Sequence, residues 1–202
     1  MTRPVPFTLV SPTLPTLRGQ RYGQGTHSVL LIHDVGKDLD AWGRLPETLA
    51  LAGYCVLTVD LPGHGLSNGP FTRELLPAIV DSLLDHAAAQ GTTSCHLIAA
   101  GPVAGAALAA AGSAKISTLT GLSPRLDERW RAALRGHIGP KLLLASSLDQ
   151  ADLESAQQFF QVCRGPTILS TLPVPETGCR LLASAWADHA VEQILLFLRR
   201  NA

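Results

Sequence analysis

Cys179 carries the side chain in this sequence that is best suited to nucleophilic chemistry. A thiol becomes a nucleophile when a histidine or another cation beside it lowers its pKa. Arg180 is adjacent, but a neighbouring Asp149 would raise that pKa, so the favoured interpretation of Cys179 is a small buried apolar residue. His189 lies near the C-terminus, where we expect a surface position for it.

Three carboxylates lie close together at Asp34, Asp38 and Asp40, with Gly36 between them. Oxygen ligands of this kind could hold a hard cation. Exposed carboxylates in a loop more often serve solvation and helix capping, and Asp40 suits the N-cap of a helix that starts at Ala41. We therefore expect no metal and no cofactor.

Length and composition restrict the class of protein. The 202 residues fit one domain, 1–202, and 46% hydrophobic against 16% charged residues argue against disorder. The chain has 16 Lys and Arg residues and 16 Asp and Glu residues, so its formal net charge is zero and no nucleic acid partner is expected. The longest apolar stretch, 97–111, is too short to span a membrane. The four cysteines show no CxxC spacing, so we expect neither a zinc site nor disulfides. This fits a soluble, cytoplasmic protein. The cysteines are Cys55, Cys95, Cys163 and Cys179.

Apolar runs alternate with helical segments along most of the chain, which indicates an α/β protein. Two short strands, 7–10 and 16–22, are expected to pair within an N-terminal segment 1–24. The later strands are predicted at 28–33, 54–59, 95–99, 115–119, 141–145 and 167–171. Between them, helices are predicted at 41–52, 73–90, from 102 onward, and at 126–135, 151–162 and 182–200. This order indicates a mostly parallel sheet with helices on both faces, and functional groups then gather at the carboxyl ends of the strands.

Several segments resemble the α/β-hydrolase superfamily: SVLLIHDVGKDLDAW, LTVDLPGHGLS and CHLIAAGPVAGAALA. The DLPGHGLS motif, from Asp60 to Ser67, is an almost perfect match. KLLLASSLDQADLESAQQFF is similar to the strand and loop of the family's acidic residue, and VPETGCRLLAS to its histidine loop. The resemblance implies an α/β-hydrolase fold without a lid, since 120–140 holds only a short helical segment. It also implies structural roles for His33 and His64.

The same resemblance implies a degenerate catalytic triad. Gly101 stands at the nucleophile position, and Pro102, which has no N–H, stands where an oxyanion-hole donor belongs. Cys179 stands at the histidine position, so only Asp149 of the triad remains. The vestigial pocket would comprise His33, Asp34, Val35, Gly101, Pro102, Asp149 and Cys179.

These losses favour a non-catalytic binding or assembly component, with a protein partner or a second copy of the chain. One alternative is an esterase-like hydrolase or a lyase that uses non-standard residues around Asp149 and Cys179. Another is a carrier or sensor that holds a small-molecule ligand in the vacated pocket. A candidate docking surface is a helical segment that carries Arg125, Arg129, Arg131 and Arg135 and turns Leu126, Trp130 and Leu134 toward the protein.

Overall fold

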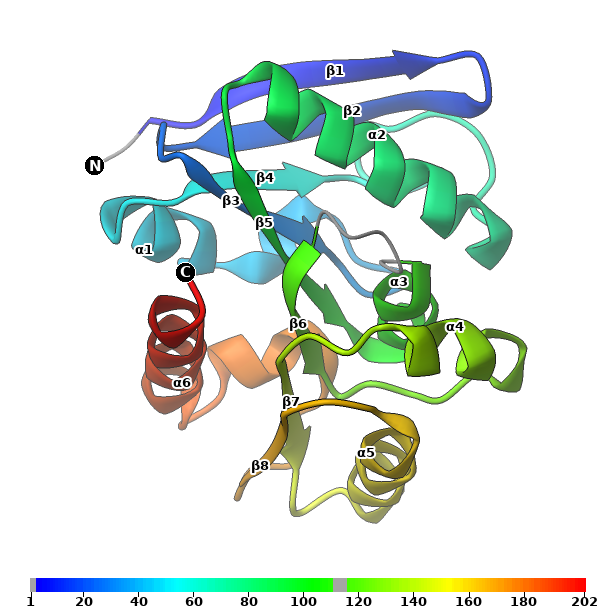
Figure 1. The fold of residues 1–202 in the computed structure, drawn as a ribbon, viewed down its shortest axis with the longest axis vertical. Coiled ribbons are helices and arrows are strands. Elements are labelled where there is room, and N and C mark those ends of the chain that lie inside the picture. The colour runs from blue at the N-terminus through cyan, green and yellow to red at the C-terminus, as the bar shows by residue number, and fades with distance from the viewer. Residues whose placement is uncertain (1–2, 111–115) are drawn as a thin grey trace.

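The computed structural model describes residues 3–110 and 116–202, and its strands form one twisted sheet (Figure 1). The strand order is β1-β2-β4-β3-β5-β6-β7-β8. Neighbours from β4 through β3 to β8 are parallel, whereas β2 pairs antiparallel with both β1 and β4. The strands are β1 (Val5–Ser11), β2 (Leu14–Tyr22), β3 (His27–Ile32), β4 (Cys55–Val59), β5 (Ser94–Ala100), β6 (Ile116–Leu122), β7 (Lys141–Ser146) and β8 (Thr167–Leu172).

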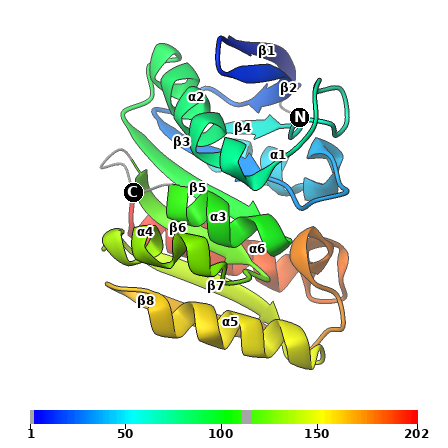
Figure 2. The ribbon, with the colours of Figure 1, turned by 90° about the vertical axis from the view of Figure 1, so that its right-hand side faces the viewer.

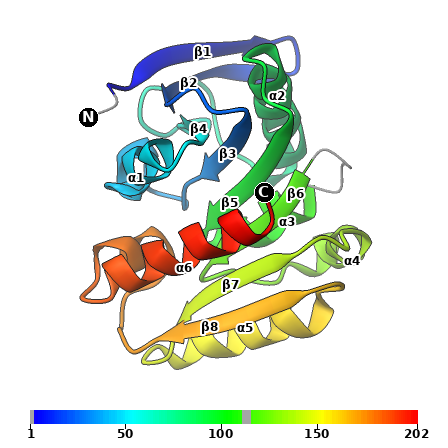
Figure 3. The same cartoon turned by 60° about the vertical axis from the view of Figure 1, so that its left-hand side comes forward.

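Helices cover both faces of the sheet, and each face has its own apolar core. Figure 2 shows one group in front of the sheet: α2 (Leu76–Ala89), α3 (Ala104–Ala110), α4 (Arg131–Gly136) and α5 (Gln150–Val162). Figure 3 shows the other group, α1 (Leu45–Leu51) and α6 (Ala187–Arg200). Short 3₁₀ helices precede most of them: η1 (Leu39–Trp42), η2 (Arg73–Leu75), η3 (Gly101–Val103), η4 (Glu128–Trp130) and η5 (Gly178–Ala183). The central strands are continuous apolar runs because helices bury them on both sides.

Two predicted helices differ from the observed ones for local reasons. The helix predicted at 41–52 is split at Gly43, whose φ of 54° ends η1 before α1 begins. Because η1 starts at Leu39, its N-cap is Asp38, whose side chain accepts the N–H of Asp40, and not Asp40 itself. The helix predicted at 182–200 is likewise divided, at Ser184, into η5 and α6.

The segment between β6 and β7 carries η4 and α4 and holds no cap domain. Leu134 is buried in the core, and Leu126 and Trp130 pack against it. β6 extends to Leu122 rather than ending at 119, because residues 120–122 pair in register with β5. The first residue of the predicted strand, 115, lies outside the described residues.

The DLPGHGLS motif braces the loop that follows β4. The carboxylate of Asp60 accepts the N–H groups of Leu39 and Leu66, each at 2.8 Å. Ser67 Oγ donates to the carbonyl oxygen of Asp60 at 2.7 Å. A Cβ at Gly65 would overlap the Asp60 carboxylate, so glycine is required there. The motif therefore holds the loops in position and is not arranged for a reaction.

His33 and His64 connect the loops after β3 and β4. His33 Nε2 accepts the N–H of Leu61 at 2.9 Å, while its Nδ1 donates to the carbonyl oxygen of Asp34 at 2.8 Å. His64 Nε2 accepts the N–H of Gly36 and its Nδ1 donates to a backbone carbonyl, both at 2.9 Å. Both nitrogens of each ring are engaged with backbone groups, so neither ring is free to transfer protons.

Candidate active site

The turn after β5 begins with Gly101, the residue predicted to stand at the nucleophile position. Gly101 has a φ of 64° and leads into η3 and α3. A Cβ at this position would overlap the carboxylate of Asp34. The Asp34 carboxylate thus fills the place that a side chain at position 101 would take, and only glycine fits beneath it.

Asp34 reaches this place from the end of β3. Its Oδ1 accepts the N–H of Val35 at 2.8 Å, which fixes the carboxylate. Its Oδ2 lies 2.7 Å from the point where a Cβ on Gly178 would be. Burial raises the pKa of Asp34, while the Val35 hydrogen bond and the cation of Arg125 act in the opposite direction.

Ser123 lies beside Gly101, one strand away. Ala100 of β5 pairs with Leu122 of β6, so the next residues, Gly101 and Ser123, are neighbours at the carboxyl ends of the two strands. Ser123 has a φ of 52° and is the one non-glycine residue with positive φ in the described part of the chain. Such strain costs about 1 kcal/mol or more and is concentrated at functional sites.

The hydroxyl of Ser123 has two well-defined partners. Its Oγ donates to Asp152 Oδ2 at 2.9 Å and accepts the N–H of Gly178 at 2.8 Å. Asp152 Oδ2 also accepts the N–H of Ser146 at 2.7 Å, which orients the carboxylate. A hydroxyl within hydrogen-bond distance of a base that a third group orients is the geometry of an activated nucleophile.

Asp152 is buried on α5, with 1% of its surface exposed, and its Oδ1 has no hydrogen-bond partner. Burial raises the pKa of Asp152, and the negative charge of Asp149 acts in the same direction. The hydrogen bonds from Ser146 and Ser123 and the cation of Arg125 oppose this rise. A carboxylate with a raised pKa is a stronger base when it is ionised.

A cavity of about 220 Å³ joins these groups at the carboxyl ends of the strands, where the η5 segment (orange in Figure 2) passes. The cation of Arg125 acts on both carboxylates, Asp34 and Asp152. The lining holds no histidine among the described residues. It comprises Asp34, Val35, Gly101, Pro102, Ser123, Arg125, Asp152, Thr177 and Gly178.

No family model matches this sequence. One relative, named as the dihydrolipoyllysine-residue acetyltransferase component of an acetoin cleaving system from Cupriavidus necator, is 48% identical over 52 residues. That match covers 26% of this chain, and the chain spans only 14% of that relative's length.

Solved structures match over nearly the whole chain. A dienelactone hydrolase from Anabaena variabilis has a TM-score of 0.82 at 18% identity, with 99% of this chain and 98% of that chain covered. An esterase from Pyrococcus furiosus has a TM-score of 0.80 at 16% identity, covering 98% and 90%. An enol-lactonase from Burkholderia xenovorans has a TM-score of 0.76 at 16% identity, covering 92% and 97%.

This chain has the α/β-hydrolase fold. The resemblance inferred from the DLPGHGLS and strand-end motifs is thereby confirmed, as is the mostly parallel sheet without a separate cap domain. The interpretation as a non-catalytic binding component is wrong on this comparison, because the solved structures that match carry the names of hydrolases. The comparison favours the hydrolase alternative, although Asp149 and Cys179, on which that alternative placed the chemistry, show no catalytic arrangement. The hydroxyl beside Gly101 is that of Ser123, and its carboxylate partner Asp152 comes from α5.

Within this hydrolase fold, the residues of the predicted vestigial pocket are only partly brought together. Asp34, Val35, Gly101 and Pro102 line the cavity, whereas His33 is buried beneath the loops. Asp149 is the N-cap of α5, where its Oδ1 accepts the N–H of Asp152 at 2.9 Å.

Two other predicted groups have no arrangement for a reaction, although Cys179 lies near Asp34. Cys179 is 3% exposed, and burial raises its pKa to about 12, so its thiol is not a thiolate at neutral pH. His189 is exposed on α6 and bonds to Gln193 of the same helix.

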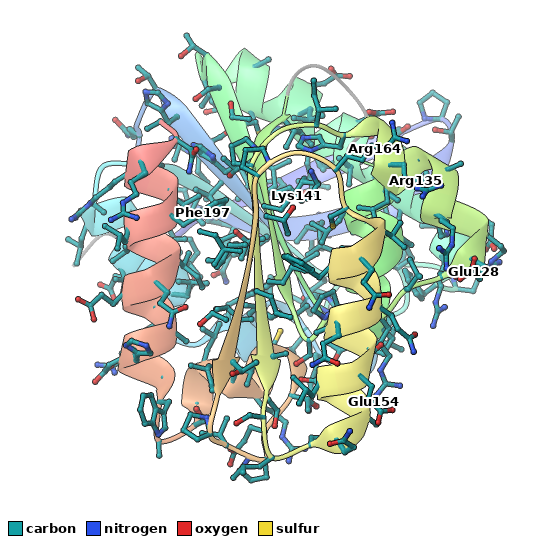
Figure 4. The ribbon with its side chains drawn as sticks, turned by 60° about the horizontal axis from the view of Figure 1, so that its bottom comes forward. Glu128, Arg135, Lys141, Glu154, Arg164 and Phe197 are labelled. Atoms are coloured by element: carbon teal, nitrogen blue, oxygen red, sulfur yellow. The ribbon has the colours of Figure 1, made fainter. Side chains whose placement is uncertain are left out.

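The arginines of the candidate docking surface differ in what their side chains contact. Arg125 lines the cavity. Arg129 pairs with Glu74 and Asp127, and Arg131 pairs with Glu128. Arg135 lines a shallow groove near Arg164 (Figure 4). The partner predicted for this surface stays a prediction.

Ser123 and Asp152 were missed by sequence reasoning. Ser123 lies directly after β6, but the predicted strand ended at 119, which placed this serine in a connecting segment. Asp152 lies three residues after Asp149, on the same side of a helix. The signal that could have found them is the pair Ser123-Pro124 at the end of an apolar run, since proline cannot continue the strand ladder.

A second cavity, of about 340 Å³, lies at the opposite end of the sheet, near Lys141 and Phe197 (Figure 4). Its lining is mainly apolar. The ammonium of Lys141 donates to three carbonyl oxygens, at 2.7 to 2.8 Å, and is therefore occupied; they belong to His137, Gly139 and Arg164. This cavity offers no nucleophile with a base.

Among the described residues, no cluster of three histidine, cysteine or acidic side chains has the geometry of a metal site. Asp34, Asp38 and Asp40 follow the same loop without converging on a common point. Within the same residues, no helix is long and apolar enough to cross a membrane.

Proposed function

We propose that this chain is a hydrolase of small acyl esters or lactones, with Ser123 as nucleophile and Asp152 as its base. The observation that carries the proposal is the 2.9 Å hydrogen bond between Ser123 Oγ and Asp152 Oδ2, beside the vacated elbow at Gly101. The names of the similar solved structures, an esterase and two lactone hydrolases, support the substrate class.

In this proposal the acyl group is transferred to Ser123. The Oγ atom attacks the carbonyl carbon while its proton passes to Asp152 Oδ2. The intermediate then collapses, the bond to the leaving oxygen breaks, and that oxygen takes a proton from water at the cavity, while Asp152 keeps the proton of Ser123. The N–H of Gly178, 2.8 Å from Oγ, stabilises negative charge on the attacking oxygen. Arg125 supplies a cation at the cavity for the charge that develops on the substrate.

The size of the cavity restricts the substrate. About 220 Å³ is smaller than the 300 Å³ or more of most pockets for drug-sized ligands. We therefore expect an acetyl group or a small lactone ring to fit, and a long acyl chain to be excluded. We also propose the cytoplasmic location predicted from the cysteines. That location does not identify the substrate.

The test is ester and lactone turnover by the purified chain. The substrates are p-nitrophenyl acetate, butyrate and octanoate, whose acyl groups increase in length, and small lactones. We expect the acetate to be cleaved fastest, and Ser123→Ala to lose on the order of 10³-fold or more of that activity. Ser147→Ala is the matched control, because Ser147 lies near the same end of the sheet, after β7, and outside the cavity lining.

Two results would overturn the proposal. One is the absence of turnover above buffer for every substrate in the series. The other is turnover that Ser123→Ala leaves unchanged, since that would place the reaction elsewhere on the molecule.

A further inference from the structure

The Asp34 carboxylate occupies a place where this fold otherwise has a nucleophile. It lies against Gly101, so close that no other residue type fits there. A half-buried carboxylate without a full set of partners costs part of the desolvation free energy of a fully buried one. Its position at the carboxyl ends of the strands, in the same cavity as Ser123, therefore calls for a chemical role.

The two oxygens of this carboxylate are not equivalent. Oδ1 accepts the N–H of Val35 at 2.8 Å and is held by it. Oδ2 has no hydrogen bond within the described structure and lies beside Gly178, the residue whose N–H binds Ser123 Oγ. Asp34 Oδ2 and Ser123 Oγ thus lie against the same residue of η5, and Oδ2 is the oxygen free to bind a water molecule.

An acyl group on Ser123 can leave only if water attacks it, and water then needs a base. No histidine lines the cavity in the described structure. Asp152 is badly placed for this step, because its Oδ2 already binds Ser146 N–H and the Ser123 oxygen, and its Oδ1 is shut off from solvent. Asp34 is half-buried and borders the cavity, so water can reach it.

We propose that Asp34 is the base that activates water to release the acyl group from Ser123; this rests on the proposed function. Asp34 Oδ2 takes a proton from water as the water oxygen bonds to the acyl carbon. The bond between that carbon and Ser123 Oγ then breaks, and Asp152 returns to Oγ the proton that it took during acylation. Asp34 gives its proton to the hydroxide that formed when water protonated the leaving oxygen. The acid leaves, and Ser123 and Asp34 regain their starting states. Two carboxylates thereby divide the work that a single histidine does in a triad.

Asp34→Asn tests this division because asparagine keeps the shape and the acceptor for Val35 N–H but cannot take a proton. With p-nitrophenyl acetate we expect a burst of about one nitrophenol per chain, followed by a steady rate roughly 100-fold below wild type. Intact-mass and peptide measurements should find one acetyl group on Ser123. Hydroxylamine, a nucleophile that needs no base, should raise the steady rate of this variant far more than that of wild type.

Asp40→Asn is the matched control, since Asp40 is an exposed carboxylate of the same loop. It should behave as wild type. If Asp34→Asn releases the acetyl group at the wild-type rate, or is never acetylated while wild type is, this inference is overturned and the proposed function stands. If no chain, wild type included, is acetylated on Ser123, the proposed function itself fails.

Discussion

At the residue scale, Gly101 and Asp34 depend on each other. Gly101 has a φ of 64°, and a Cβ there would also overlap the Asp34 carboxylate. A serine reintroduced at position 101 would therefore meet two obstacles, the backbone conformation and the carboxylate. A single substitution therefore cannot place a side chain at position 101 without moving Asp34.

Gly101→Ala should lower the free energy of unfolding for two reasons, the positive φ at this position and the overlap of the new Cβ with Asp34. Gly36→Ala is the control, because Gly36 has a φ of 75° and open space around it. We expect Gly36→Ala to cost about 1 kcal/mol. Gly101→Ala should cost about 1–3 kcal/mol more, from overlap. Denaturant unfolding of both variants, with and without Asp34→Ala, measures the difference.

The extra cost at Gly101 should disappear when Asp34 is alanine, while the cost at Gly36 should not change. Residues in direct contact show such non-additive effects, and separated ones do not. Equal costs in both backgrounds would mean that the Asp34 carboxylate does not occupy the elbow.

The pH dependence of turnover also belongs to the residue scale. In the proposed reaction Asp152 accepts the proton of Ser123 only when it is ionised, and burial raises its pKa above the ordinary value of 3.8. Activity should therefore rise with pH through that raised pKa and then stay level through neutral pH. A profile of kcat/KM with p-nitrophenyl acetate measures this. A step near 6.5 that a histidine substitution removes would show that a histidine, and not Asp152, is the base.

At the scale of elements, the start of α5 carries two carboxylates with different roles, the N-cap Asp149 and the proposed base Asp152. Asp149 accepts the N–H of Asp152 and so satisfies the first turn of the helix. Asp149→Ala should lower the free energy of unfolding by about 1 kcal/mol, whereas Asp149→Asn should preserve most of the cap. Chemical denaturation measures both. Turnover of the folded Asp149→Asn variant should stay near wild type, and its loss without a loss of stability would instead make Asp149 the catalytic carboxylate.

The order of elements could be predicted from sequence because each central strand is an apolar run and each helix has its own periodicity. The position of the site could not. A three-residue error at the end of β6 moved Ser123 from a strand end into a connection. The register of β5 against β6, which sets Ser123 beside Gly101, depends on packing between distant segments. Gly101 could be singled out from the sequence, but the groups proposed for the reaction, Ser123 and Asp152, lie on other elements.

At the scale of the whole molecule, the two cores meet at the sheet, and His96 lies in it. It is fully buried on β5, its Nδ1 shares a hydrogen bond with Thr118 Oγ1 at 2.8 Å, and its Nε2 has no partner. The ring of Tyr54 packs edge-on against it. Burial lowers the pKa of His96 to about 4, and the nearby His27 adds to this. The fold therefore accommodates only the neutral ring.

This burial makes the protein sensitive to acid. Below pH 6.5 the unfolded chain binds a proton at this histidine, while the folded chain does not until about pH 4. The stability that the neutral ring contributes is thus complete above 6.5 and is lost as the pH falls through this window. The loss should reach about 3 kcal/mol. Burial also raises the pKa values of Asp34 and Asp152, which acts in the opposite direction as the pH falls.

His96→Asn isolates the contribution of His96 because its side-chain oxygen can still accept from Thr118 and all other titrating groups are unchanged. The variant should be less stable than wild type at pH 7, and the difference should shrink by about 3 kcal/mol at pH 4. Urea unfolding at several pH values measures this convergence. Parallel curves would mean that His96 titrates alike in the folded and unfolded chain. In that case water or a rearranged loop reaches the middle of the sheet, and the two cores are less closed than their packing indicates.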